Sequence, residues 1–171
     1  MTPLVFLEKY GEEVHPKIER YYRSKRNFGV EVAAGFSPNV TLVHYDVTPK
    51  NIFLPDATNL PPVFFDWELL ARGYVGLELA NILGKCVKPD DLVNLPDMVN
   101  EYLATMRSFG VTDLTFKTLW DDFRFGCLAR LAAPIALSSR NQPASDRLAL
   151  TILPRTTLAV LATDALELLE N

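Results

Sequence analysis

The chain has 171 residues, of which 49% are hydrophobic and 22% charged, and its formal net charge is −4 at pH 7. This size and composition fit one globular domain with a proper core and exclude extended disorder, and the acidic balance gives no general attraction to nucleic acid. Two cysteines and two histidines, without CxxC or HExxH spacing, exclude a disulfide scaffold and the common zinc motifs.

The sequence carries no signal for export or membrane insertion. Acidic residues follow the first methionine too closely for a signal peptide, and the first apolar run is too short to span a bilayer. We therefore expect a cytoplasmic protein with reduced cysteines and no membrane partner. The basic cluster at 17–26 is interpreted as the solvated face of a helix rather than a nucleic-acid site.

The first forty residues predict two helices followed by an irregular connection. Apolar spacing over 4–10 indicates a short helix that ends near Gly11. A second helix is expected over 16–26, because Pro16 suits a first helical turn. The glycines and proline within 28–39 indicate an irregular segment.

Three short apolar runs, at 40–44, 51–54 and 63–66, predict strands in the middle of the chain. Each run is bounded by Pro, Asp or Asn, which is typical of short strands joined by loops. The turn-rich stretch 55–62 joins the last two runs. These two are therefore expected to form a small antiparallel hairpin.

The rest of the sequence predicts helices, so the expected fold class is mainly α with a short β-hairpin (α+β). One helix is expected from about 77 to 84, and another from 96 or 97 to a stop at Gly110. A long helix capped by Asp113 is expected to kink or end at Pro134. The last helix, within 145–169, is expected to be interrupted near Pro154.

One polar cluster lies among the short strands. Asn51 follows Asp46 by five positions across a proline-containing loop, and Asp66 closes the next strand. The predicted hairpin would return Asp66 alongside this loop, so that three oxygen-bearing side chains converge. Such oxygens suit magnesium. Alternatively, Asp46 and Asn51 serve only to cap the loop by bonding backbone amides.

The pattern HxDxxxxN at 44–51, followed by Asp-Trp-Glu at 66–68, resembles the catalytic loop and metal-binding aspartate of the kinase fold. Asp-Trp-Glu in place of Asp-Phe-Gly is similar to the aminoglycoside phosphotransferase and choline kinase superfamily. The stretches LVHYDVTPKNIFL, VFFDWELLARG, LELANILGK and DDFRFGCLARLAAPIAL follow the order of that superfamily, and the likeness covers roughly 40–140. It implies the C-terminal lobe of a protein-kinase-like fold.

The resemblance implies a role for each matching residue. Asp46 would be the catalytic aspartate that accepts or orients the proton of the acceptor hydroxyl, and Asn51 and Asp66 would hold Mg²⁺ bridging the phosphates of ATP. The resemblance implies a single domain over 1–171. It would consist of leading helices and a loop at 1–39, the catalytic loop and metal-binding hairpin at 40–70, and a helical subdomain at 71–171.

Further residues would support this site. His44 would steady the loop by hydrogen bonds, and Phe53 would lie on the floor of the adenine site. Glu78 stands where the superfamily usually has an aspartate that braces the loop. With Glu78, three positions depart from the pattern, since Tyr45 replaces a usual glycine and Thr48 stands where many protein kinases carry a lysine.

The expected function is ATP- and Mg²⁺-dependent transfer of phosphate to a small-molecule hydroxyl. The residues before His44 contain no Gly-rich phosphate loop and no strand bearing a suitable lysine. We therefore expect a truncated, weak or inactive enzyme unless an N-lobe is supplied by a partner chain or a homodimer forms. The alternative is a non-catalytic, pseudokinase-like binding or interaction module.

The acceptor is not identified by the sequence. Glu101, Asp121 and Asp122 are candidates for holding a cationic acceptor such as an aminoglycoside or choline. They are equally interpreted as ordinary solvated residues of helices.

Overall fold

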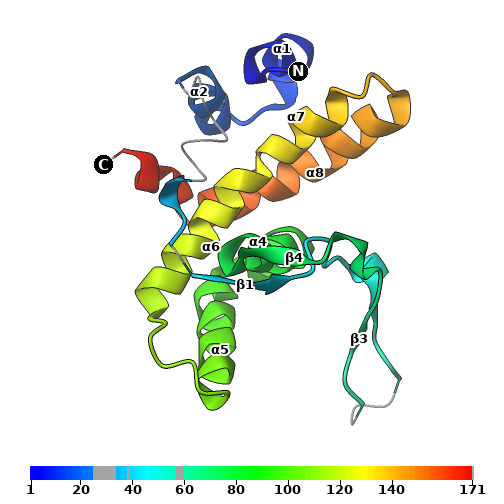
Figure 1. The fold of residues 1–171 in the computed structure, drawn as a ribbon. Helices are drawn as coiled ribbons and strands as arrows, with labels where there is room; N and C mark the ends of the chain where they lie inside the picture. Colours follow the sequence, from blue (N-terminus) through cyan, green and yellow to red (C-terminus); the bar gives the residue numbers. More distant parts are fainter. Residues whose placement is uncertain (25–33, 38, 57–59, 171) are drawn as a thin grey trace.

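The computed structural model describes residues 1–24, 34–37, 39–56 and 60–170, which form a mainly helical α+β fold with two small antiparallel sheets (Figure 1). The α-helices are α1 (Pro3–Tyr10), α2 (Pro16–Ser24), α4 (Val75–Cys86), α5 (Leu95–Ser108), α6 (Phe116–Arg130), α7 (Ala132–Ser138) and α8 (Pro143–Ala162). The strands are β1 (Val40–Val43), β2 (Ile52–Phe53), β3 (Val63–Phe64) and β4 (Ala71–Tyr74). Short 3-10 helices are η1 (Gly11–Glu13), η2 (Pro49–Asn51), η3 (Trp67–Leu69), η4 (Pro89–Asn94) and η5 (Ala165–Leu169).

Helices α4 and α6 form the centre of the fold, and glycine stands where they touch. A Cβ atom at Gly126 would collide with the carbonyl oxygen of Gly76, and one at Gly76 would collide with the backbone of Asp122. The two backbones therefore approach more closely than any side chain would allow. The largest side chains that are fully buried in the core are Phe6, Ile18, Tyr22, Leu95, Val99, Leu103, Leu119, Phe123, Leu128, Leu131 and Leu153.

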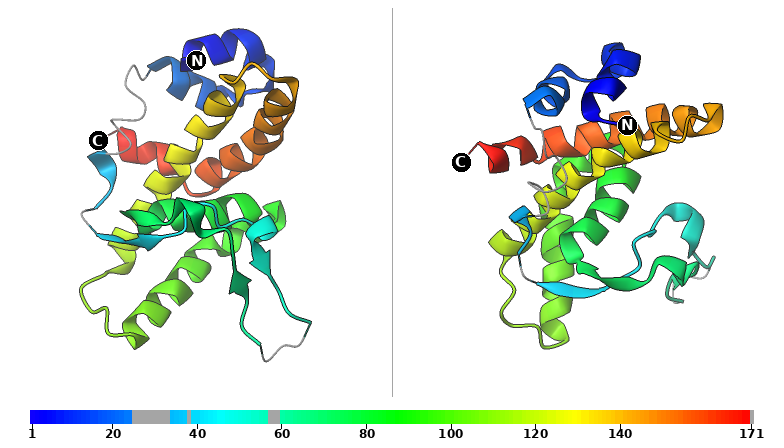
Figure 2. Two further views of the ribbon diagram at one scale, coloured as in Figure 1. Left: turned by 45° about the vertical axis from the view of Figure 1, so that its right-hand side comes forward. Right: turned by 45° about the horizontal axis from the view of Figure 1, so that its top comes forward.

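Helices α1 and α2 pack together above α7 and α8 in the view of Figure 1, and Figure 2 shows the same arrangement from two further sides. The hydroxyl of Tyr22 in α2 donates a hydrogen bond to the carbonyl oxygen of Leu131, at 2.6 Å. Leu131 lies at the break between α6 and α7, so this bond satisfies a carbonyl where the helix stops. Lys9 in α1 forms an ion pair with Asp146 in α8, with 2.8 Å between Nζ and Oδ2.

The two sheets lie on one side of the helices. Strand β1 pairs with β4, with Val40 opposite Tyr74 and Val43 opposite Ala71. The predicted hairpin is confirmed as β2 and β3, with Ile52 opposite Phe64. This hairpin extends away from the helical body as an arm (Figures 1 and 2).

Most predicted helices are confirmed, and Gly110, with a φ angle of 93°, lies directly beyond the end of α5 as expected. The predicted cap at Asp113 is wrong, because the side chain of Thr115 accepts the capping bond from the Thr118 amide. The expected interruption at Pro154 is also wrong, since α8 runs through it. Burial of Leu153 and other residues of α8 outweighs the lost backbone bond.

Two further details concern the ends of helices. The helix before Pro134 already stops at Arg130, and Pro134 lies in the first turn of α7, where a missing backbone donor is tolerated. The predicted end of the second helix at Arg26 falls outside the described residues. In the part of the chain that is described, no helix combines the length and apolarity needed to cross a membrane.

We predict that Gly126→Ala destabilises the fold by about 1–3 kcal/mol, because the added methyl group must push α4 and α6 apart. Gly11→Ala is the matched control, since nothing lies within 4 Å of a Cβ at that position. Urea unfolding followed by circular dichroism measures both free energies of unfolding. Equal stability of the two variants would contradict the close crossing.

The ion pair between Lys9 and Asp146 predicts a component of stability that depends on pH. Hydrogen bonds from Lys9 and then Ser138 lower the pKa of Asp146 from 3.8 to about 2. The stabilisation is therefore complete above pH 3.8 and is lost as the pH falls towards 2. Asp146→Asn should make urea midpoints less sensitive to pH in this window than Asp97→Asn, an exposed control. The same pH slope in both variants would show that the pair does not anchor α1.

Candidate functional site

The loop at 44–51 connects β1 to β2 and contains most of the predicted site residues. His44 and Asn51 at its two ends are each only 3% exposed. Tyr45 has a φ angle of 63°, so the chain turns sharply directly after His44. Pro49 then begins η2, in which the backbone N–H of Asn51 donates to the carbonyl oxygen of Thr48, at 2.8 Å. These two turns bring the ends of the loop together.

Asp46 and Asn51 are in direct contact. The side-chain amide of Asn51 donates to both the carbonyl oxygen and Oδ2 of Asp46, each at 2.9 Å. Lys50 places its Nζ 3.0 Å from the same Oδ2. Partial burial opposes ionisation of Asp46, but the hydrogen bonds from Lys50 and Asn51 outweigh it and lower the pKa of the carboxyl group. Asp46 is thus an ionised carboxylate whose Oδ1 has no hydrogen-bond partner among the described residues.

The backbone of the hairpin connects Asp66 to the contact between Asp46 and Asn51. The amide of Phe65 donates to the carbonyl oxygen of Asn51, at 3.1 Å, and Asp66 follows in a left-handed conformation with a φ angle of 66°. The hydrogen bond and charge of Asp46 raise the pKa of Lys50, and the charges of Asp66 and Glu68 act in the same direction. No hydrogen bond joins the Asp66 side chain to Asp46 or Asn51 in the described structure.

His44 ties the loop to the hairpin. Its Nδ1 accepts a hydrogen bond from the Asp46 amide, at 3.3 Å, so Nε2 carries the proton and donates to the carbonyl oxygen of Phe65, at 2.9 Å. The imidazole ring also lies 4.5 Å from the ring of Trp67, between centroids. Both ring nitrogens of His44 are therefore used to hold the backbone on either side of the site.

Glu78 in α4 holds the start of the loop. Its two carboxylate oxygens accept hydrogen bonds from the amides of His44, at 2.7 Å, and Tyr45, at 3.1 Å. One turn later on the same helix, the side-chain amide of Asn81 donates to the carbonyl oxygen of Tyr45, at 2.9 Å. The backbone on both sides of Tyr45 is thus fixed from α4. Asn81 is fully buried, and it is a supporting residue that the sequence analysis missed.

Tyr45 itself packs against β4. A Cβ atom at Gly73 would collide with the phenol ring and hydroxyl of Tyr45, so the strand gives up a side chain at this position to make room for the tyrosine. The bulky residue at 45 is therefore accommodated by the glycine at 73.

The side chain of Asn51 has a neutral oxygen that it could offer to a cation. Its side-chain nitrogen is occupied by Asp46, which leaves Oδ1 without a protein partner in the described structure. Carboxylate and amide oxygens together suit Mg²⁺. Within the described residues, no cluster of three or more His, Cys, Asp or Glu side chains is arranged to hold a metal ion. The predicted magnesium ligands are of a different type from such a cluster, because they combine the carboxylates of Asp46 and Asp66 with the amide of Asn51.

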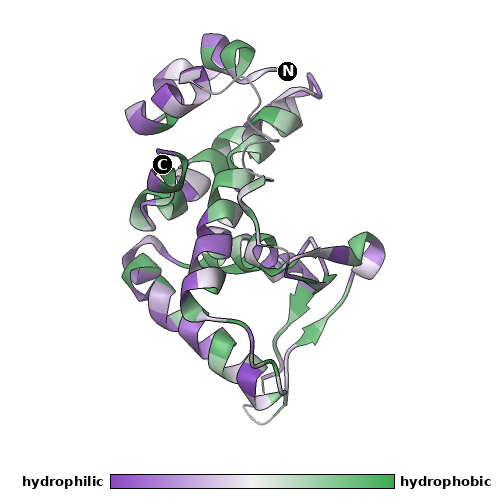
Figure 3. Ribbon diagram, turned by 60° about the vertical axis from the view of Figure 1, so that its left-hand side comes forward, coloured by the Kyte–Doolittle hydropathy of each residue, from purple (hydrophilic) through white to green (hydrophobic). Residues whose placement is uncertain are grey.

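The hairpin and the residues after it carry many exposed apolar side chains, and the strands of the arm have the green colour of hydrophobic residues in Figure 3. Phe53, the predicted adenine-site residue, belongs to it and is 61% exposed. We call this surface the hairpin face, and its exposed apolar residues are Phe53, Leu54, Leu60, Val63, Phe64, Phe65, Trp67, Leu69 and Leu70. A gathering of exposed apolar residues in one segment is typical of an interface.

The acidic residues considered for a cationic acceptor are used elsewhere in the fold. Asp122 is 2% exposed and accepts hydrogen bonds from the amide and the hydroxyl of Ser37. Asp121 pairs with Lys117, at 2.7 Å, and Glu101 is exposed on α5 without a salt bridge in the described structure. None of the three contacts the 44–51 loop through a described hydrogen bond or ion pair.

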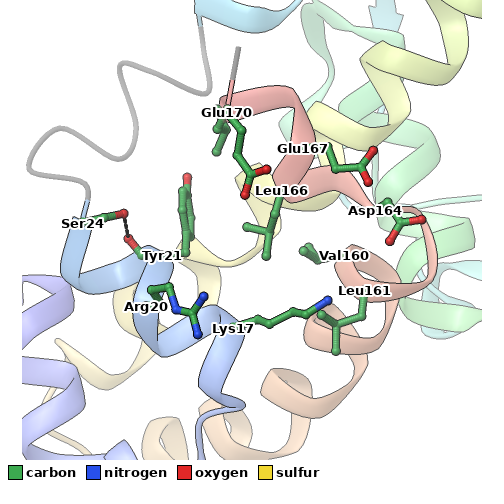
Figure 4. Close-up of a pocket in the computed structure, with 11 residues that line it drawn as sticks. Lys17, Arg20, Tyr21, Ser24, Val160, Leu161, Asp164, Leu166, Glu167 and Glu170 are labelled. Atoms are coloured by element: carbon green, nitrogen blue, oxygen red, sulfur yellow. Dashed lines mark hydrogen bonds between the residues drawn. The ribbon is translucent and has the colours of Figure 1, made fainter.

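A separate cavity of about 450 Å³ lies between α2 and the C-terminal η5, on the side of the helical body away from the hairpin (Figures 1 and 4). Lys17 and Arg20 line one wall, and Asp164, Glu167 and Glu170 line the other. Opposite charges of the chain itself therefore face this cavity, and none of the predicted site residues line it.

We predict that Glu78→Gln loosens the start of the loop. The glutamine has one acceptor in place of two, so the amide of His44 or Tyr45 loses its partner, at about 1–3 kcal/mol. Hydrogen exchange of these two amides should accelerate at least tenfold, measured by NMR. Glu101→Gln, on the exposed face of α5, should leave both rates unchanged, and equal rates in the two variants would refute the bracing role.

Comparison with known proteins gives no match. No family model fits the chain, and no curated protein and no solved structure is significantly similar to it.

Proposed function

We propose that this chain is the Mg²⁺-binding, catalytic lobe of a kinase-like phosphotransferase that transfers the γ-phosphate of ATP to the hydroxyl group of a small molecule. The observation that carries the proposal is the contact between Asp46 and Asn51. The side-chain amide of Asn51 donates two hydrogen bonds of 2.9 Å to Asp46, inside a loop held by Glu78 and His44. A loop that only capped itself would not need a carboxylate with one free oxygen beside an amide with its oxygen free.

Asp46 acts on the acceptor. Its Oδ2 is fixed by Lys50 and Asn51, so Oδ1 is the atom that accepts a hydrogen bond from the acceptor hydroxyl. As the hydroxyl oxygen forms its bond to the γ-phosphorus, the bond from that phosphorus to the bridging oxygen of ADP breaks and the hydroxyl proton passes to Oδ1. The lowered pKa of Asp46 makes it a weak base, which suits a residue that mainly orients the nucleophile.

Asn51 and Asp66 would hold the magnesium ion, through Oδ1 of the amide and the exposed carboxylate. When bound, Mg²⁺ neutralises charge on the phosphates of the nucleotide. Lys50 stands at the same edge of the loop, where its charge is near Asp46 and Asp66. It takes the place of the cationic helper that Thr48 does not provide.

The hairpin face supports the second part of the proposal, that a nucleotide-covering body packs on this side. Phe53 and its apolar neighbours are exposed where such a body would sit over the nucleotide. That body would come from an N-lobe on a partner chain or on preceding sequence, or from a second copy of this chain. We therefore expect the isolated chain to bind ATP weakly and to turn over slowly.

One observation favours a second candidate, a pseudokinase-like module that binds without catalysis. Lys50 already occupies Oδ2 of Asp46, at 3.0 Å, and this ion pair weakens the carboxylate as a base. Turnover distinguishes the two candidates. Release of ADP that depends on Asp46 supports catalysis, and metal-dependent binding without ADP release supports the module.

We predict that millimolar Mg-ATP raises the melting temperature of the protein, because a ligand that binds only the native state stabilises it. Asp66→Asn should reduce the affinity at least tenfold, or about 1.4 kcal/mol, by removing a carboxylate ligand. Asp90→Asn is the control, since Asp90 is exposed in η4 and away from the motif.

The comparison uses differential scanning fluorimetry with Mg-ATP, with ATP plus EDTA, and with Mg²⁺ alone. The proposal requires a shift that needs both Mg²⁺ and ATP, that survives in Asp90→Asn and that is lost in Asp66→Asn. A shift of the same size in all three proteins, or no shift with Mg-ATP, would overturn it.

A further inference from the structure

The cavity between α2 and η5 has an apolar floor and a charged rim. Val160 and Tyr21, which line it, are buried, and Leu161, Leu166 and Leu169 are partly buried. Its volume of about 450 Å³ is within the range of sites for small molecules, roughly 300–1,000 Å³. The floor therefore suits the apolar body of a ligand, and the rim determines which charges that ligand carries.

Two cations form the rim on the α2 side. Arg20 and Tyr21 lie on the same face of α2 as Lys17, because they follow it by three and four residues. Tyr21 packs inward, whereas Lys17 and Arg20 stay exposed beside it, and neither cation forms an ion pair in the described part of the chain. Lys17 is in the first turn of α2, where the helix dipole disfavours a cation, so the helix alone does not explain its position.

Two carboxylates form the rim on the η5 side, and the fold holds the first of them in place. Asp164 precedes η5 with a φ angle of 49°, and its carbonyl oxygen accepts a hydrogen bond from Nη2 of Arg124, at 2.5 Å. The carboxylates of Asp164 and Glu170 are exposed and form no ion pair among the described residues. Glu167, by contrast, is engaged by Arg124, at 3.5 Å. The rim thus offers two carboxylates as well as two cations.

Figure 4 shows how these groups face the cavity. In this view the side chains of Lys17 and Arg20 extend along the lower edge, and Glu170 lies at the upper edge with Asp164 to its right. Leu166 lies between the cations and Glu170. The two signs of charge are therefore on different sides of an apolar patch.

Interactions within the protein leave these charges unexplained. No ion pair joins Lys17 or Arg20 to Asp164 or Glu170 in the described structure. Scattered surface charges are simply solvated, but here both signs border one cavity with an apolar floor. A ligand with a single charge would be repelled by one side of the rim, whereas a ligand with both charges is attracted by each side.

We propose that this cavity is a second binding site, separate from the loop at 44–51, for a zwitterion with an apolar body, and that its ligand is a short apolar peptide with free termini. Lys17 and Arg20 bind the terminal carboxylate, Asp164 and Glu170 bind the terminal ammonium group, and the apolar side chains rest on the floor. A peptide fits better than a free amino acid, because an extended dipeptide separates its two charges by about 7 Å.

The test is a methyl NMR titration of the whole chain with four probes, without nucleotide or Mg²⁺. The dipeptide Leu-Leu has both charges and an apolar body. N-acetyl-Leu-Leu lacks the cation, Leu-Leu amide lacks the anion, and Gly-Gly lacks the apolar body. Leu-Leu should shift the methyl signals of Val160, Leu161 and Leu166 and should bind roughly tenfold or more tightly than each other probe. No shift with Leu-Leu, shifts confined to other methyl groups, or equal affinity of another probe would overturn the proposal.

Charge variants assign each end of the peptide. Lys17→Gln should weaken the binding of Leu-Leu roughly tenfold and leave that of Leu-Leu amide unchanged, because the amide has no carboxylate. Asp164→Asn should weaken Leu-Leu and leave N-acetyl-Leu-Leu unchanged, and asparagine tolerates the left-handed backbone at this position. Lys88→Gln is the matched control, since Lys88 is an exposed lysine at the start of η4 and does not line the cavity.

These variants each remove one exposed charge and should fold like the unaltered protein. If Asp164→Asn does not fold, Glu170→Gln takes its place. Lys88→Gln should bind all four probes with unchanged affinity. Full affinity for Leu-Leu in both cavity variants, or an equal loss for Leu-Leu and its blocked analogues, would show that the charges of the rim do not recognise the termini.

Discussion

The hydrogen bonds that the amides of His44 and Tyr45 donate to Glu78 are the contacts on which the site depends. Tyr45 has a left-handed backbone that a large residue adopts only at a cost, and the loop needs that conformation to turn away from β1. Glu78 and Asn81 satisfy the backbone on both sides of the turn and so compensate for the strain. Because both side chains come from one rigid helix, α4 determines the position of Asp46.

The close crossing of α4 and α6 extends this dependence into the core. Glycines at 76 and 126 let the two backbones touch, and the crossing sets where the last turns of both helices lie. Glu78 and Asn81, which hold the loop, lie on α4 and so depend on this crossing. The hairpin, by contrast, is attached to the loop through few bonds, among them those from Phe65 to Asn51 and from His44 to Phe65. One side of Asp46 is thus built on packed helices and the other on an exposed arm.

Local patterns in the sequence were sufficient for the hairpin and most helices, because turn residues and helical spacing act over a few positions. They failed at β4, where Ala-Arg-Gly-Tyr has no alternation and becomes a strand by pairing with β1. They also failed at Pro154, where burial of α8 overrides a local preference. In the site, the motif located Asp46, Asn51 and their support from Glu78. It could not reveal Asn81, which reaches the loop only after α4 has packed against it.

The exchange of space between Tyr45 and Gly73 has a consequence for how this loop can vary. The phenol ring stands where a side chain of β4 would otherwise be, so the two positions form one steric unit. A glycine at 45 would leave a void beside Gly73, and any side chain at 73 would exclude the tyrosine and collide with Val43 as well. The two positions are therefore coupled, and a single change at either one leaves a hole or a clash beside Asp46.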